Sequence, residues 1–66
     1  MKLDVNGTPH NVPTDTSVAQ LLTLLNVGAG PIAVEVNGEI VPRSSFNNHR
    51  LQEHDRIEIV QAIGGG

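Results

Sequence analysis

The chain has 66 residues, a formal net charge of −3, one aromatic residue and no cysteine. This length predicts one small domain with a thin aliphatic core, and the lack of cysteine excludes disulfides and thiolate metal sites. The bases form no clustered basic run and no segment is apolar enough to span a membrane, so we expect neither nucleic acid nor a bilayer as partner. The first residues do not form a secretory signal, which predicts a cytoplasmic protein.

The first predicted element is a β-hairpin. Residues 2–5 alternate apolar and polar side chains, as the residues of a half-buried strand do. Asn6-Gly7 follows, and this dipeptide is a strong hairpin signal because both turn residues take a positive φ. We therefore expect residues 8–12 to return antiparallel, and Pro9 and Pro13 confine that strand to the edge of a sheet.

One helix is expected next. Ser17 and Gln20 fit a capping box, in which each side chain satisfies a backbone N–H of the other residue. The apolar positions that follow have helical spacing: Val18, Leu21, Leu22 and Leu25. We expect the helix to end over residues 26–31, with a glycine in the left-handed position and Pro31 preventing continuation.

A second hairpin is predicted by the alternation of residues 32–36, the turn Asn37-Gly38 and the short return over residues 39–41. Because a hairpin joins antiparallel strands, these two segments should pair directly. The order of elements so far is strand, strand, helix, strand, strand.

The segment 43–51 is irregular, and we expect a short helix or structured loop there, with Ser44 or Ser45 as its cap and Phe46 turned inward. After a polar turn, residues 56–60 alternate as a last strand. The whole order favours an α+β fold, a mixed sheet of about five short strands crossed by one helix, since each layer can bury its apolar side only against the other.

The titratable side chains form no catalytic or metal-binding set. His49 and His54 are five positions apart across a predicted turn and not on one helical face, so we interpret them as solvated loop residues. Five acidic side chains are expected in solvent, on turns and outward strand faces: Glu35, Glu39, Glu53, Asp55 and Glu58. We therefore predict no enzyme active site, no bound metal and no bound cofactor.

Three glycines in a row, Gly64, Gly65 and Gly66, stand at the carboxyl end. Because glycine has no Cβ, an extended glycine segment fits a channel too narrow for other residues and lets its backbone approach a partner's active site. A free carboxylate is a poor acyl donor, but adenylation with ATP converts it to a mixed anhydride with a good leaving group. The hypothesis is that the α-carboxylate of Gly66 is the reactive group.

With these motifs the chain resembles the thiamine-biosynthesis sulfur carrier family (ThiS), of the ubiquitin-like β-grasp fold. The resemblance covers essentially all 66 residues, and four stretches carry it: residues 17–22, 37–43, 51–60 and 62–66. Two residues depart from the family pattern. His54 stands where the family usually has glycine, which predicts local strain, and Phe46 stands where the family commonly has tryptophan.

The resemblance implies one β-grasp domain over residues 1–66, with 61–66 as an exposed, flexible carboxyl-terminal tail. It implies that Gly66 is adenylated by an E1-like adenylyltransferase that consumes ATP, receives sulfur from a persulfide relay protein as a thiocarboxylate, and donates it to thiazole synthase. The protein is then a cosubstrate and not an enzyme. The alternatives are a carrier of the molybdopterin or tRNA-thiolation type, and a β-grasp interaction module with an inert tail.

Partners also need a docking surface. By the alternation of the last strand, Ile57 and Ile59 face the core and the residues between them face outward. We expect an exposed apolar strip, rimmed by charge, that docks the partners; it comprises Val60, Ala62 and Ile63 with Arg56 and Glu58 at its rim. The competing interpretation is that Val60 or Ile63 closes the edge of the core.

Overall fold

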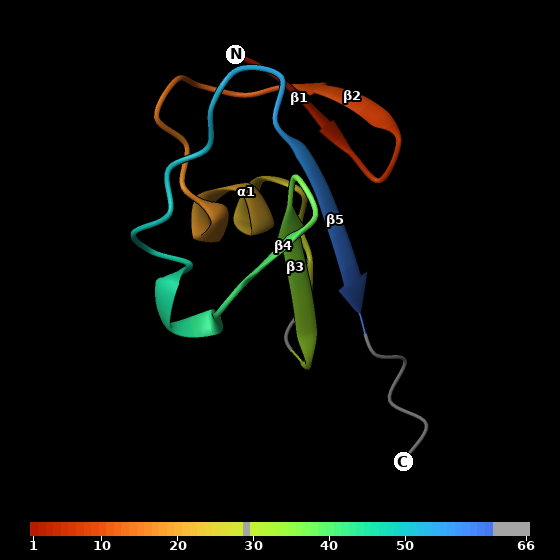
Figure 1. Cartoon of the computed structure of the whole chain (residues 1–66), viewed down its shortest axis with the longest axis vertical. Coiled ribbons are helices and arrows are strands. Elements are labelled where there is room, and N and C mark those ends of the chain that lie inside the picture. The colour runs from red at the N-terminus through yellow and green to blue at the C-terminus, as the bar shows by residue number, and fades with distance from the viewer. Residues whose placement is uncertain (29, 62–66) are drawn as a thin grey trace.

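The computed structural model describes residues 1–28 and 30–61, and its elements follow the predicted order (Figure 1). The elements are β1 (Lys2–Val5), β2 (Thr8–Asn11), α1 (Val18–Leu24), β3 (Ile32–Val36), β4 (Glu39–Val41), the 3₁₀ helix η1 (Arg43–Ser45) and β5 (Arg56–Gln61). The predicted flexible tail over residues 62–66 lies outside the described residues. None of the helices in the described ranges combines the length and the apolar character that crossing a membrane requires.

The five strands form one mixed sheet in the order β2-β1-β5-β3-β4. The two hairpins are antiparallel, as predicted, and β5 inserts between them, parallel to β1 and antiparallel to β3. The strand that contains Pro9 lies at the sheet edge, which confirms the prediction from that proline. Helix α1 lies on one side of the sheet (Figure 1), so the α+β prediction is confirmed.

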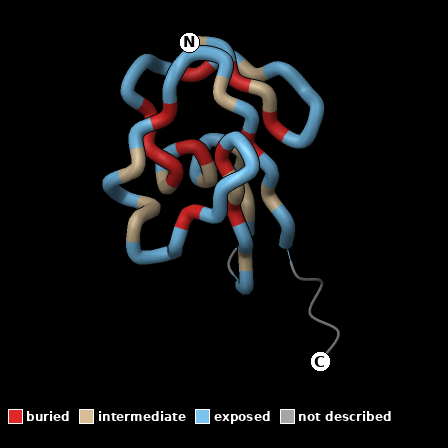
Figure 2. The backbone as a smooth tube through the Cα atoms, viewed as in Figure 1, coloured by how far each residue is buried: buried red, intermediate tan, exposed pale blue. Residues whose placement is uncertain are grey.

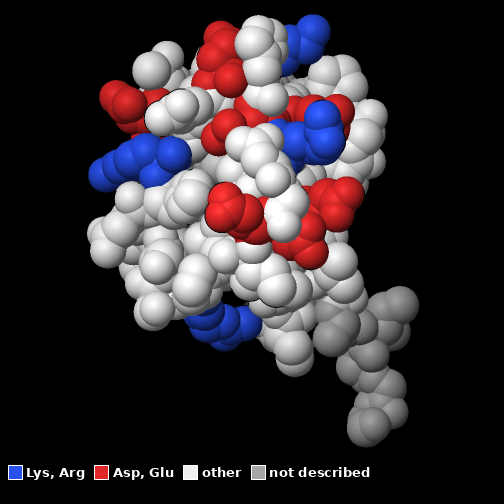
Figure 3. Space-filling model, viewed as in Figure 1, with Lys and Arg blue, Asp and Glu red and all other residues white. Residues whose placement is uncertain are grey.

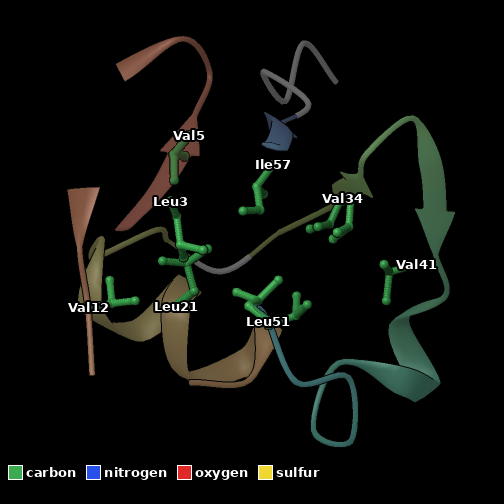
Figure 4. Close-up of a cluster of buried hydrophobic side chains, with 10 residues drawn as sticks. Leu3, Val5, Val12, Leu21, Val34, Val41, Leu51 and Ile57 are labelled. Atoms are coloured by element: carbon green, nitrogen blue, oxygen red, sulfur yellow. The ribbon is translucent and has the colours of Figure 1, made fainter. Parts of the chain in front are cut away.

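The core lies between α1 and the inner face of the sheet. Its most completely buried side chains come from four different elements and are Leu3, Val18, Leu21, Val34 and Ile57. Figure 4 shows side chains from the strands and the helix converging on this space, and Figure 2 shows the buried backbone segments gathered there. Leu51, in the loop between η1 and β5, is 3% exposed and contributes to the core. Phe46 is partly buried and packs against the core, as predicted.

Both ends of α1 are closed by local hydrogen bonds. The capping box is present: the Gln20 N–H donates to Ser17 Oγ at 3.1 Å, and the Ser17 N–H donates to Gln20 Oε1 at 2.9 Å. At the other end, the prediction of a left-handed glycine is wrong, because Asn26 takes that conformation with φ 58°. The Val27 N–H then donates to the Leu22 carbonyl at 3.0 Å, which completes a Schellman-type end.

Two further expectations about element ends are corrected. Ser44 and Ser45 do not cap η1; they lie within it, the residue before it is Pro42, and no side chain caps it. The last strand also runs one residue further than predicted. Gln61, predicted as part of the tail, pairs with Ile32 and belongs to the sheet, because β3 extends far enough to offer it a partner.

Each hairpin turns at its Asn-Gly pair, and all four turn residues have the predicted positive φ. Asn6 and Gly7 have φ 51° and 84°, and Asn37 and Gly38 have φ 53° and 85°. These angles match a type I′ turn, whose twist suits the strands that it joins.

The two turn asparagines also hold the central strand β5. The Ile59 N–H donates to Asn6 Oδ1 at 2.9 Å, and Asn6 Nδ2 donates back to the Ile59 carbonyl at 3.3 Å. On the other side of β5, the Arg56 N–H donates to Asn37 Oδ1 at 2.9 Å, and Asn37 Nδ2 donates to Asp55 Oδ1 at 2.9 Å. Asparagine therefore supplies both the turn conformation and a hydrogen-bonded clamp on β5.

This clamp predicts the effect of Asn37→Gly, which keeps the left-handed turn but removes two hydrogen bonds. We expect a loss of about 1–2 kcal/mol in the free energy of unfolding, measured by urea denaturation. Asn26→Gly is the matched control, because it makes the same change at another left-handed asparagine, whose side chain makes no hydrogen bond within the described residues. Equal effects of the two substitutions would contradict the clamp.

His54 has φ 68° and therefore takes the left-handed conformation. This agrees with the local strain that is predicted because the ThiS family usually has glycine at this position. A residue with a Cβ is strained there by about 1 kcal/mol. We expect His54→Gly to raise the melting temperature by a few degrees, about 2–6 °C for a domain of this size. An unchanged or lower melting temperature would show that the histidine side chain compensates for the strain.

Candidate functional site

The predicted site divides at residue 61. Gly64, Gly65, Gly66, Ala62 and Ile63 lie outside the described residues, so their roles stay predictions. The described part is the strand that leads to them, β5, with its neighbours. The candidate site therefore consists of β5, its neighbouring strands and the contacts that position its last residue, Gln61.

Strand β5 alternates between the two faces of the sheet as predicted. Ile57 is fully buried on the inner face and Ile59 is half-buried there, whereas Arg56 and Glu58 are exposed on the outer face. Val60 is also on the outer face, and 64% of its surface is exposed. The competing interpretation that Val60 closes the core is therefore wrong.

The outer face continues from β5 onto the next two strands. Val60 is in register with Ala33, and Glu58 is in register with Glu35, which in turn pairs with Ile40 on β4. Ile40 has 72% of its surface exposed, more than Val60. We did not single out Ile40 from the sequence, although the buried position of Val41 in the same short strand requires its neighbour to face outward.

The end of β5 is anchored before the chain enters residues 62–66. Gln61 pairs with Ile32, and its side-chain amide lies beside the loop that follows α1, since a side chain built at Gly28 would begin 3.6 Å from Gln61 Nε2. Arg43 in η1 ties down the same loop by donating from Nη2 to the Gly30 carbonyl at 3.1 Å. The tail therefore starts from a defined place at one end of the sheet.

The carboxylates are not all solvated as predicted. Asp55 is half-buried, and besides its bond to Asn37 it accepts from the Gln52 N–H at 2.8 Å, so it shapes the turn before β5. Glu35 is also half-buried. Among residues 1–28 and 30–61, no three metal-ligating side chains are grouped closely enough to hold a metal ion.

The fold and the position of β5 are those of a ubiquitin-like β-grasp protein, with one helix against a five-stranded mixed sheet and the chain end leaving the central strand. The model of the ThiS family matches residues 3–66. The chain therefore belongs to the ThiS family.

Individual relatives agree with this assignment. The chain is 30% identical over 66 residues to the sulfur carrier protein ThiS of Escherichia coli, and the match covers 100% of both chains. A crystal structure of the thiamine biosynthesis protein ThiS from Geobacter metallireducens superposes with a TM-score of 0.85 at 35% identity and 100% coverage of both chains. The chain is also 42% identical over 66 residues to a thiazole synthase of Magnetococcus marinus, covering 100% of this chain and 20% of that protein.

The exposure of Val60 generates a prediction for Val60→Asp. Because the side chain lies in solvent, we expect the variant to fold, with a loss below about 1 kcal/mol in the free energy of unfolding. The same substitution at Val34, which is 1% exposed, is the matched control and should prevent folding, because it buries an unpaired carboxylate. Circular dichroism and thermal unfolding measure both. Loss of the fold in Val60→Asp would contradict the outward orientation.

Proposed function

We propose that this protein is a sulfur carrier of thiamine biosynthesis and that the carboxylate of Gly66 carries the sulfur. The observation that supports the proposal is membership of the ThiS family over residues 3–66, a range that includes the three glycines. The full-length match to the Escherichia coli protein named as a sulfur carrier supports the same function.

The proposed chemistry takes place entirely on the terminal carboxyl group. A carboxylate oxygen of Gly66 attacks the α-phosphorus of ATP, pyrophosphate leaves, and an acyl-adenylate forms. The terminal sulfur of a protein persulfide then attacks the acyl carbon and AMP leaves; a thiol cleaves the resulting acyl disulfide and releases the thiocarboxylate. An E1-like adenylyltransferase binds and consumes the ATP, so this chain itself needs no nucleotide site.

The described structure suits this role because the proposed docking surface on β5 and the proposed reactive group at Gly66 are different parts of the chain. The pairing of Gln61 with Ile32 at the end of the sheet sets the point from which the tail starts. Gly64, Gly65 and Gly66 would then enter the partner's channel, where the absence of Cβ atoms allows close approach. The outer face of β5 stays available for docking through Val60, with Arg56 and Glu58 beside it.

Thiazole synthase is the proposed sulfur acceptor. In the thiazole synthases of Magnetococcus marinus and Paramagnetospirillum magneticum, the segment that matches this chain makes up 20% of the polypeptide. This chain thus spans about a fifth of the length of those proteins. A carrier-like segment joined covalently to its acceptor has a high effective concentration at the acceptor's active site, and this supports a functional pairing of the two.

The intact mass of the protein tests the proposal. Protein isolated from cells that contain active partner enzymes should carry a terminal mass increase equal to the exchange of one oxygen for one sulfur, and fragmentation should place it on Gly66. Its reproducible absence under those conditions would refute the proposal. Sulfur transfer to a molybdopterin precursor or to tRNA, and not to the thiazole, would assign one of the other carrier types.

A deletion of Gly65 and Gly66 supplies the matched control. The truncated chain should keep its fold and melting temperature, because the sheet ends at Gln61, but it should not be adenylated. An interaction module with an inert tail would instead keep its partner binding unchanged after the deletion. Val60→Asp should leave Gly66 intact and lower the rate of adenylation through weaker docking.

A further inference from the structure

The outer face of the sheet carries an ordered row of three side chains from three strands. Ile40 on β4 is in register with Glu35 on β3, and Glu35 is in register with Glu58 on β5. The next row toward the chain end is apolar and consists of Ala33 and Val60. An acidic pair is thus bordered by exposed apolar side chains, Ile40 at 72% and Val60 at 64% exposure.

The acidic pair is unfavourable in the free protein. Side chains of directly opposed strand residues lie about 4.5–5.5 Å apart at Cβ, and like charges in that position destabilise a sheet. Figure 3 shows several acidic side chains over β4 and β5 on the face that it draws, with a basic side chain beside them. Glu35 and Glu58 cost stability and do not contribute to the core, so they are candidates for contacts with a partner.

The bases of the chain do not fully balance the acidic side chains on this face. Within the described residues, the guanidinium groups of Arg43 and Arg50 donate to the carbonyls of Gly30 and Asp15. By the alternation of β1 and β5, Lys2 and Arg56 lie on the same face as the acidic pair, and Arg56, two residues before Glu58, is in register with Asp4. The outer face of β1, β3 and β5 thus carries three carboxylates, Asp4, Glu35 and Glu58, against two bases, so the acidic pair can still accept a positive charge from outside the chain.

We infer that the adenylating partner places a basic side chain, best an arginine, over Glu35 and Glu58, with apolar groups against Ile40 and Val60. An arginine fits both features, because its planar guanidinium can bond two carboxylate oxygens and its aliphatic stem packs on apolar surface. The inference rests on the proposed function, since it assigns the surface to the enzyme that acts on Gly66.

The position of the face relative to the chain end supports this partner. Gly66 is six residues beyond Val60, so its carboxylate reaches at most about 20 Å from that side chain. An enzyme that binds the carboxylate must therefore cover surface close to the end of β5. Charges in the docking surface then change mainly the rate of association and the alignment of the two proteins, and not the rate of the chemical step.

The test is the double variant Glu35→Gln/Glu58→Gln in a steady-state adenylation assay with the purified adenylyltransferase and ATP. We expect the KM for the carrier to rise about tenfold, the effect of losing one charge-assisted contact, while kcat stays unchanged. Free of the partner, the variant should melt at the wild-type temperature or up to about 5 °C above it, because the like-charge repulsion is gone.

Glu39→Gln is the control for the loss of a single carboxylate, because Glu39 is an exposed β4 residue that is in register with Val36 and therefore outside the acidic row. Its KM should equal that of wild type. Raising the salt concentration should increase the wild-type KM and leave that of the double variant nearly constant.

Two results would overturn the inference. One is a double variant whose KM stays within twofold of wild type while the wild-type carrier is adenylated normally. The other is self-association of the wild-type chain through this face, seen by sedimentation as a dimer that the double variant alters. If the wild-type carrier is not adenylated at all, the proposed function itself fails and the inference falls with it.

Discussion

The insertion of β5 between the two hairpins is the constraint on which the rest of the structure depends. Ile57, in its middle, is fully buried between the sheet and α1, and its backbone pairs with β1 on one side and β3 on the other. Asn6 and Asn37 add hydrogen bonds from the two turns. The two hairpins are not paired with each other, so β5 is the strand that joins them into one sheet.

The same strand divides its residues between the core and an exposed face. Alternate side chains of β5 enter the core or face outward, and the outward ones extend into rows with β3 and β4. A chain of this size has too little interior for a catalytic cavity, but it can offer one face of its sheet to a partner. Like charges in register across a sheet, as at Glu35 and Glu58, cost little stability, and this face can carry them because the core lies on the other face.

The proposed reaction needs little from the fold beyond this arrangement. The reactive atoms belong to the backbone of Gly66, and the nucleotide and the sulfur come from partners. The fold contributes a fixed starting point at Gln61, held by β3 and bordered by a loop that Arg43 ties down. Because β5 is paired with β3 up to Gln61, a partner that binds the chain end has less conformational entropy to remove.

Local patterns in the sequence determined the elements: the Asn-Gly turns, the Ser17 and Gln20 capping box, and the alternation that places Val60 outward all depend on near neighbours. Tertiary structure alone decided the pairing of β5 with β1 and β3, the clamps by the turn asparagines, the half-buried Asp55 and the row from Ile40 to Glu58. It also extended β5 to Gln61. The physical reason is that these contacts join residues distant along the chain, and no local propensity encodes which strands become neighbours.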